Sequence, residues 1–383
     1  MSMEAGAYTL MHQRKSFYLA LAVLTFTLLT GCFGEDKLKE AVDAYTARLS
    51  RVLDTTLTVS APTESLPFPD RARLHKVIEP INLNLREFYA IDECELSTLI
   101  AQRNTTLGKS QLPSQRFAYE STLNRVLNDC KSELRSQASD RYAVVNGWHE
   151  KKQAQFGAAW ANMIQTSNEM KLGLSLSDRL LSADNNKDAQ ASITALYYLD
   201  SLLNMSSGTL ARNGSTSTLP DSETALSSNE PGTPPTRLSK EIETQLHIIA
   251  SSRLPATMWN TQTYLTSSLS ALTQSLEPAL DGISCPDGRA SDTAKIARNV
   301  FYLFFINEIQ PIGSALNNYH YKLLPLWQKW QKNSDLQPAF KAYISAYAET
   351  RFAAYQAAMS KHVVLWQGFL ARCNLSPTAP HAS

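Results

Sequence analysis

The chain has 383 residues, of which 43% are hydrophobic and 19% charged, a balance typical of a globular protein with one large or two small domains. The formal net charge is +1, and without residues 1–31 the chain carries 34 basic and 34 acidic side chains. No basic stripe or cluster stands out, so the composition argues against nucleic acid as a partner.

The amino-terminal segment has the layout of a secretion signal. Arg14 and Lys15 precede a 13-residue apolar run from Phe17 to Leu29, which is shorter than the roughly 20 residues of a bilayer-spanning helix. The run leads into Leu-Thr-Gly-Cys, which resembles the lipobox of bacterial lipoproteins, in which the cysteine is acylated and becomes the new amino terminus. We therefore predict a lipoprotein signal peptide over residues 1–31 and lipid on Cys32. An ordinary signal with a chance cysteine is the alternative.

Acylation of Cys32 would fix the protein to a membrane, because each buried methylene of an acyl chain contributes about 0.8 kcal/mol. Phe33 follows Cys32, so the aspartate that often retains enteric lipoproteins in the inner membrane is absent. We expect the periplasmic face of the outer membrane. The sequence does not decide whether translation starts at Met1, Met3 or Met11.

The rest of the chain is dominated by the helical period. Apolar side chains recur every three or four residues from about Glu35, through most of 70–182, and again over 187–204. The 70–182 stretch is predicted to start as helix near Asp70, with Val77 on its apolar face. Strand signals are scarce, and with only 14 glycines the turns of an all-β fold are missing.

Helical patterns resume near Leu238. The apolar run from Val300 to Ile306 is too short to cross a bilayer and predicts a buried core helix. From Pro338 to Leu370 the period continues for about nine turns, and proline suits a first helical turn. We therefore predict an all-α fold, a helical bundle of long amphipathic helices.

Residues 205–237 change character, since serine, threonine, glycine, asparagine and proline dominate them. Such a segment cannot bury enough apolar surface to order itself. We interpret it as a disordered insertion between two halves of a helical domain, 32–204 and 238–383. A flexible linker between two domains is the alternative.

Four cysteines remain besides Cys32, namely Cys94, Cys130, Cys285 and Cys373. An even number in the oxidising periplasm predicts two disulfides, for which three connectivities exist. We favour the sequential pairing, because the first two flank one candidate helical hairpin and the last two flank the carboxy-terminal helices. Their spacing is not that of zinc ligands or a redox CxxC motif.

No residue pattern points to catalysis. His149-Glu150 lacks the second histidine of an HExxH site, and His75 with Glu79 is more typical of a surface pair than of a metal site. G-x-S-x-G and phosphate-binding glycine loops are absent. We therefore predict no catalytic residue, no metal and no cofactor, although triads can assemble from distant positions.

Aromatic residues crowd the carboxy-terminal third. They suit either a groove for an apolar ligand or partner helix, or, as we favour, a helical core. The residues are Phe301, Tyr302, Phe304, Phe305, Tyr319, Tyr321, Trp327 and Trp330.

Two stretches carry a resemblance. The first contains Cys94-Glu95-Leu96, Leu99-Ile100 and Arg103-Asn104-Thr105-Thr106-Leu107-Gly108; the second contains His362, Trp366-Gln367, Phe369-Leu370, Cys373 and Pro377. They resemble a family of gammaproteobacterial lipoproteins catalogued as domain of unknown function 3080. Thr105 replaces a usual serine of that pattern, and Asn374 replaces a usual glycine. The family has no established activity, so the resemblance implies no catalytic residues.

Arg103 and Asn104 are the candidate binding residues. The physical interpretation is a helix end, with a tight turn at Gly108, and a binding role for Arg103 is the sharper alternative. The hypothesis for the whole chain is a lipid-anchored, non-catalytic protein that binds or scaffolds an envelope component, such as another envelope protein. An enzyme acting on an envelope polymer or lipid, or a carrier of an apolar ligand, are the alternatives.

Overall fold

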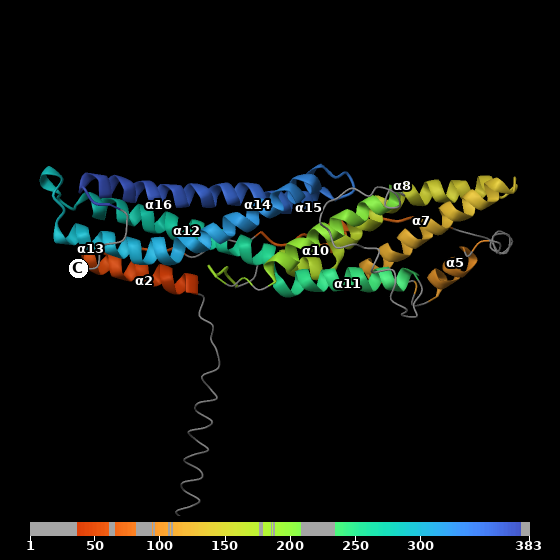
Figure 1. Cartoon of the computed structure of the whole chain (residues 1–383), viewed down its shortest axis with the longest axis horizontal. Coiled ribbons are helices and arrows are strands. Elements are labelled where there is room, and N and C mark those ends of the chain that lie inside the picture. The colour runs from red at the N-terminus through yellow and green to blue at the C-terminus, as the bar shows by residue number, and fades with distance from the viewer. Residues whose placement is uncertain are drawn as a thin grey trace, which may run out of the picture.

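The computed structural model describes residues 37–60, 66–81, 94, 96–105, 108, 110–175, 179–184, 186, 188–207 and 234–376. These residues form an elongated rod of helices, and no strand occurs among them (Figure 1). The prediction of an all-α fold is confirmed. The predicted signal peptide, Cys32 and residues 208–233 of the predicted insertion lie outside the described residues.

The elements follow one another along the chain in this order: α2 (Lys37–Val52), α3 (Arg71–Leu74), α5 (Leu96–Asn104), α7 (Pro113–Ser136), α8 (Tyr142–Thr166), α9 (Asn168–Leu174), α10 (Ala189–Ser201), η1 (Leu202–Ser207), α11 (Pro234–Ser252), α12 (Leu254–Asp281), η4 (Pro286–Gly288), α13 (Asp292–Val300), η5 (Phe301–Ile309), α14 (Gln310–Lys332), α15 (Pro338–Ser345), η6 (Ala346–Arg351) and α16 (Phe352–Arg372). One half of the rod contains α2, α12, α13, α14 and α16, and the other contains α5, α7, α8, α10 and α11 (Figure 1). Helix therefore continues to Ser207 and resumes at Pro234, so the predicted insertion of residues 205–237 is too long by three residues at its start and four at its end.

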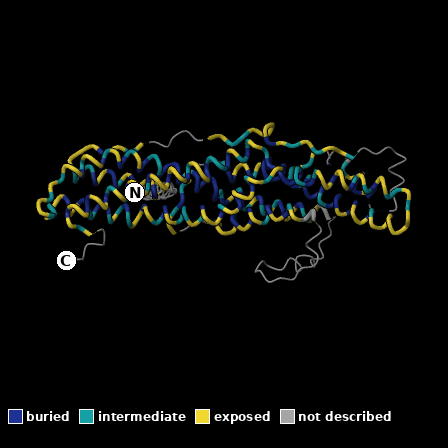
Figure 2. The backbone as a smooth tube through the Cα atoms, turned by 90° about the horizontal axis from the view of Figure 1, so that it is seen from above, coloured by how far each residue is buried: buried dark blue, intermediate teal, exposed yellow. Residues whose placement is uncertain are grey.

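The first helix shows how the apolar period builds this fold. Leu38, Val42, Tyr45 and Leu49 on α2 are all buried, as their spacing predicts. Their side chains join the larger of two apolar cores, which runs through both halves of the rod. Buried residues accordingly occur along the whole length of the rod (Figure 2). The smaller core is formed by α5, α7 and α8 together with Cys94, which precedes α5.

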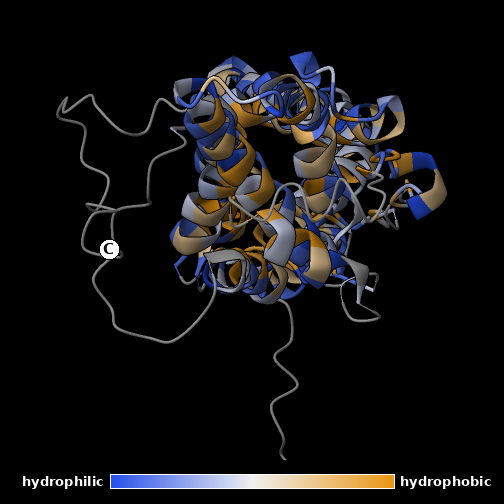
Figure 3. Cartoon of the chain, turned by 90° about the vertical axis from the view of Figure 1, so that its right-hand side faces the viewer, coloured by the Kyte–Doolittle hydropathy of each residue, from blue (hydrophilic) through white to orange (hydrophobic). Residues whose placement is uncertain are grey.

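Helices α12 and α16 run parallel and in contact. The amide of Gln262 donates to the carbonyl of Tyr347 at 2.8 Å, and farther along both helices Arg372 donates to the carbonyl of Leu280. Because both helices end at the same end of the rod, the loop after α12 meets the residue after α16. Figure 3 views the rod from its opposite end, where single helices carry both hydrophobic and hydrophilic residues. No helix among the described residues has the length and apolar character to span a bilayer.

The apolar run near residue 300 is only partly the core helix that its composition predicts. Residues Phe301–Ile309 form a π-helix, η5, which continues α13 into α14. Phe301, Phe305 and Ile309 are buried, at a spacing of four that suits the wider π turn. Leu303, in contrast, is 51% exposed. The run is too apolar to reveal a preferred face, and packing against α2 and α16 determines which side is buried.

The segment after Pro69 corrects the predicted helix. Between Asp70 and Ile81, the described part of this segment, only the four residues of α3 are helical, and His75 already has extended angles, φ −72° and ψ 131°. Val77, predicted on an apolar face, is 74% exposed. Pro80 follows closely, and a proline disfavours helix in the residue before it.

Side chains of α8 replace the helical hydrogen bonds of this extended segment. Asn162 exchanges two hydrogen bonds of 2.8 Å with the backbone N–H and carbonyl of Lys76. Gln165 donates to the carbonyl of Leu74 and accepts from the backbone N–H of Gln337 at 3.0 Å. Buried backbone groups need hydrogen-bond partners, and these two side-chain amides supply them. The extended segment therefore keeps hydrogen bonds that it would otherwise make only as a helix.

Gly173 offers a test of how closely α9 and α11 approach. A Cβ at this position would overlap the Cγ2 methyl of Ile249 and lie 3.1 Å from its carbonyl oxygen. We expect Gly173→Ala to lower the free energy of unfolding by about 1–3 kcal/mol, as overpacking does. Gly368 is the control, since nothing lies within 4 Å of its Cβ position in mid-helix. Gly368→Ala should be neutral or stabilising in the same urea titration, because alanine favours helix. Equal effects of the two variants would contradict this packing.

Candidate functional site

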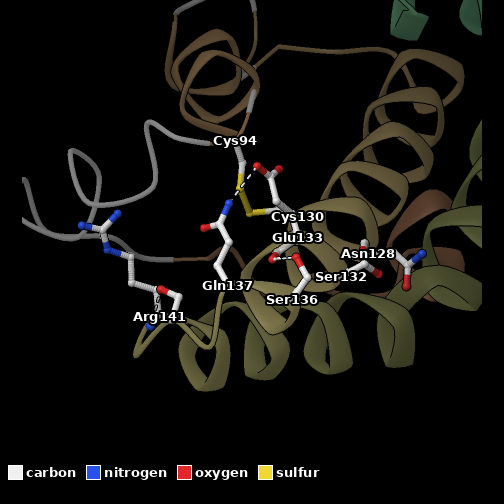
Figure 4. Close-up of a disulfide and its surroundings, with 9 residues drawn as sticks. Cys94, Asn128, Cys130, Ser132, Glu133, Ser136, Gln137 and Arg141 are labelled. Atoms are coloured by element: carbon white, nitrogen blue, oxygen red, sulfur yellow. Dashed lines mark hydrogen bonds between the residues drawn. A yellow bond between two sulfur atoms is a disulfide. The ribbon is translucent and has the colours of Figure 1, made fainter.

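The structure places Arg103, the candidate binding residue, in the last turn of α5. A disulfide between Cys94 and Cys130 connects the start of this short helix to α7, with Cα atoms 5.6 Å apart (Figure 4). Leu96, Leu99 and Ile100 of α5 are buried in the smaller core. Disulfide and core together fix α5 against α7. Asn104 ends the helix, and its side chain lies outside what the structure describes.

The residues after Arg103 hold its side chain in place. Nη1 of Arg103 donates to the carbonyl of Gly108, whose own N–H donates to the Thr105 hydroxyl at 3.0 Å. The same hydroxyl donates to the carbonyl of Gln102 at 2.8 Å, which a serine hydroxyl could also do. A Cβ on Gly108 would lie 2.6 Å from the carbonyl oxygen of Arg103. The glycine is therefore needed for close approach of two backbone segments.

Arg103 lines a cavity of about 190 Å³ between α5, α7, α8 and the extended segment at Pro80. Ile100 and Leu123 form part of its apolar wall. The polar lining consists of Arg103, Arg116, Tyr119 and Lys152. Three cations from three different helices thus surround one small cavity.

One carboxylate balances part of this charge. Glu120 on α7 lies 2.5 Å from Nη2 of Arg116, one turn earlier, and 3.2 Å from Nζ of Lys152 on α8. The side chains of Glu120 and Lys152 are both 2% exposed. Nζ of Lys152 also donates to the carbonyl of Glu79 at 2.9 Å. The buried ammonium is therefore paired, as a buried charge must be.

The remaining positive charge has no such partner. Among the described residues, no carboxylate lies within ion-pair distance of Arg103, and its buried Nε has no acceptor. Nη1 of Arg116 is also buried without one. Burial, followed by the nearby charge of Arg116, lowers the pKa of Arg103, and burial lowers the pKa of Lys152 despite Glu120. Among the described residues at the site, the three cations thus outnumber the one carboxylate by two charges.

The sequence shows only part of this site. Arg116 and Glu120 are four residues apart, a spacing that places both on one face of a helix. Lys152 carries no such signal, because its partners lie 32 and 73 residues away in sequence. The guanidinium carbon of Arg116 lies over the ring of Tyr119, 5.6 Å from the ring centre. Burial raises the pKa of the Tyr119 hydroxyl.

The other candidates from the sequence, His149 and His75, lie in surroundings typical of structural residues. The ammonium of Lys131 lies 3.1 Å from Nδ1 of His149, and burial followed by that charge lowers the pKa of His149. His75 is exposed. Within the described ranges, no three His, Cys, Asp or Glu side chains gather as a metal site would require.

The aromatic cluster of the carboxy-terminal third is divided between core and surface. Phe301, Phe305, Trp327 and Trp330 are buried, whereas Tyr321 is 54% exposed. Trp259 of α12 stacks on Tyr347 of η6, with ring centres 5.0 Å apart. The buried members therefore fill a core between helices, which is the interpretation that we favoured from their helical spacing.

The second disulfide joins Cys285, after α12, to Cys373, after α16, with Cα atoms 5.2 Å apart. The structure thus has the sequential pairing. Asn374 follows Cys373 with φ 52°, in the left-handed region, and Leu375 then donates to the carbonyl of Leu370 at 2.9 Å. Helices commonly end this way with glycine, and asparagine is the usual substitute. This geometry explains why asparagine is tolerated at this position.

The fold and the site define the class as an all-α, disulfide-linked bundle with a cationic cavity. A family model described as "Protein of unknown function (DUF3080)" matches residues 42–230 and 215–377, so the chain belongs to this family. No curated protein and no solved structure gives a significant match.

Proposed function

We propose that this protein is a lipid-anchored lipoprotein of the bacterial envelope, held on the periplasmic face of the outer membrane, and that it binds or scaffolds another envelope component without converting it. The observation that carries the anchoring is the pairing of the cysteines. The chain has five, and four of them form the two disulfides. Cys32, at the end of the predicted signal, is the one left for acylation.

The position of α2 supports a location near the membrane. Four residues lie between Cys32 and Lys37, the first residue of α2, so the five steps from one to the other span at most about 18 Å when fully extended. A lipid on Cys32 would therefore hold α2 close to the headgroups. Two disulfides also suit the oxidising periplasm.

The cationic cavity supports a binding role. Guanidinium and ammonium groups recognise carboxylates and phosphates through charge-assisted hydrogen bonds. The fold holds the charged groups of this site in position, because the carbonyl of Gly108 orients Arg103 and the carboxylate of Glu120 orients Lys152. Such groups are suited to holding a ligand.

Replacing Cys32 tests the anchor. In cells fed labelled palmitate, the wild-type protein should incorporate label and sediment with outer membranes, and Cys32→Ser should lose both properties. The control is the double variant Cys94→Ser/Cys130→Ser, which should keep the label. A labelled Cys32→Ser protein, or a mature amino terminus elsewhere in the wild type, would overturn the proposal.

Crosslinking in intact cells followed by mass spectrometry tests the binding role. We expect a reproducible protein neighbour of the wild-type chain that is lost with Cys32→Ser, because the unanchored protein leaves its place in the envelope. Absence of any reproducible neighbour would contradict a scaffolding role.

A further inference from the structure

We propose that the cavity between α5, α7 and α8 binds a small oxyanion, a carboxylate or phosphate group, with Arg103 and Arg116 as its ligands. This inference rests on the proposed binding function and names the chemistry that the site recognises.

The first argument is the charge balance. Arg103, Arg116 and Lys152 line the cavity, and Glu120 is the carboxylate that pairs with two of them. Burying a cation without a counter-charge is unfavourable, because it loses its hydration and gains no partner. An anion in the cavity would remove this imbalance.

The second argument is the set of unused donors. Nη1 of Arg103 is bound to the carbonyl of Gly108, which orients the guanidinium, and its buried Nε has no acceptor among the described residues. Arg116 is held in the same way through Nη2 by Glu120, while its Nη1 lacks an acceptor. Two guanidinium groups are thus oriented by the fold before any ligand arrives, which lowers the entropy cost of binding.

The third argument is size. A water molecule occupies about 30 Å³ of liquid, so a cavity of about 190 Å³ holds a group several times larger than water. This fits one carboxylate or phosphate head with its nearest atoms. Ile100 and Leu123 in the wall would exclude water from one side and strengthen the charge interactions.

The test uses the mature full-length protein in a neutral detergent and inorganic phosphate or acetate as the probe. We expect phosphate or acetate to raise the unfolding temperature more than chloride at equal ionic strength, by saturable binding. Arg103→Gln should weaken that binding about tenfold or more, since it removes a charge-assisted donor. Arg125→Gln, on the exposed face of the same α7 that carries Arg116, is the matched control and should leave it unchanged.

A second variant covers the case in which Arg103→Gln fails to fold. Glu120→Gln removes the competing carboxylate and should tighten phosphate binding, while lowering stability in the absence of phosphate. Phosphate and acetate effects no greater than that of chloride would overturn the inference. So would wild-type affinity in a folded Arg103→Gln protein, or unchanged affinity in Glu120→Gln.

A lipid arm identifies the source of the anion. Binding of the unlipidated Cys32→Ser protein to phosphatidylglycerol vesicles but not phosphatidylcholine vesicles, abolished by Arg103→Gln, would support a lipid headgroup. Binding of free phosphate or acetate with no vesicle preference would support a soluble or peptide-borne anion. If the wild-type protein is labelled with palmitate and crosslinks to a neighbour but binds no anion, this inference alone is overturned. If it binds the anion but is not anchored, the proposed function alone is overturned.

Discussion

Acidification from pH 6.5 to 4.5 is expected to lower the free energy of unfolding by about 4 kcal/mol through two buried histidines. Burial lowers the pKa of His362 to about 3 and that of His320 to about 4. Well above pH 6.5, the usual pKa of histidine, both imidazoles are neutral in the folded and in the unfolded chain. Below it, the unfolded chain takes up protons that the folded chain cannot bind until the pH approaches 3 to 4, so stability falls as the pH falls.

His362 has the larger effect because its surroundings fix the neutral form. The hydroxyl of Thr273 donates to the carbonyl of Leu269 at 2.5 Å. The same hydroxyl lies 2.9 Å from Nδ1 of His362, and because its proton is already used, it accepts a hydrogen bond from Nδ1. Nδ1 therefore carries the proton, and Nε2 accepts from the Tyr45 hydroxyl at 3.0 Å. A second proton on Nε2 would set two donors against each other in a fully buried site.

His320 adds a smaller share. Its ring stacks on Phe352, with centres 3.3 Å apart, and its buried Nδ1 has no hydrogen-bond partner. No acidic side chain supports the charged form of either ring within hydrogen-bond distance among the described residues. Protonation is therefore opposed by desolvation at both positions.

Urea titrations at pH 7.5, 6.5, 5.5 and 4.5 measure this effect. His362→Gln keeps a donor and an acceptor but cannot titrate, and it should remove about half or more of the loss between pH 6.5 and 4.5. His247 is exposed on α11, and His247→Gln should leave the pH dependence as in the wild type. An unchanged pH dependence in His362→Gln would show that its imidazole does not carry the effect.

Removing the disulfide between Cys285 and Cys373 is expected to cost about 5 kcal/mol of unfolding free energy. It closes a loop of 88 residues, and opening so large a loop restores much conformational entropy to the unfolded chain. The shorter Cys94–Cys130 loop, with a separation of 36, should be worth about 4 kcal/mol by the same relation.

The measurement compares Cys285→Ala/Cys373→Ala with the wild type under non-reducing conditions. Alanine is preferred to serine because Cys373 is fully buried and a hydroxyl there would add a polar cost. Adding a reductant should destabilise the wild type but not a variant that lacks all four paired cysteines. A loss below about 1 kcal/mol in the double variant would contradict the expected gain in conformational entropy of the unfolded chain.

The local sequence determined most of the fold. The apolar period of α2 predicted most of its buried face, although Val52 is only partly buried and Ala41 and Thr46 are buried as well. Pro338 marked the start of the last long helix. The cysteine count limited the disulfides to three connectivities, and adjacency of helices in the chain favoured the pairing that the structure has. These features depend on neighbours a few residues apart, so a single sequence contains them.

Only the tertiary structure decided the extended path after Leu74 and the membership of the cationic cavity. Asn162 and Gln165 override a helical apolar pattern because they supply hydrogen bonds from 86 and 91 residues away. Arg103 was visible as a candidate, but Arg116 and Lys152 join it only through the packing of α5, α7 and α8. Tyr45 and His362, 317 residues apart, form a hydrogen bond for the same reason. Helical period specifies which face of each helix is apolar, whereas the partner of that face is determined by the packing of all helices together.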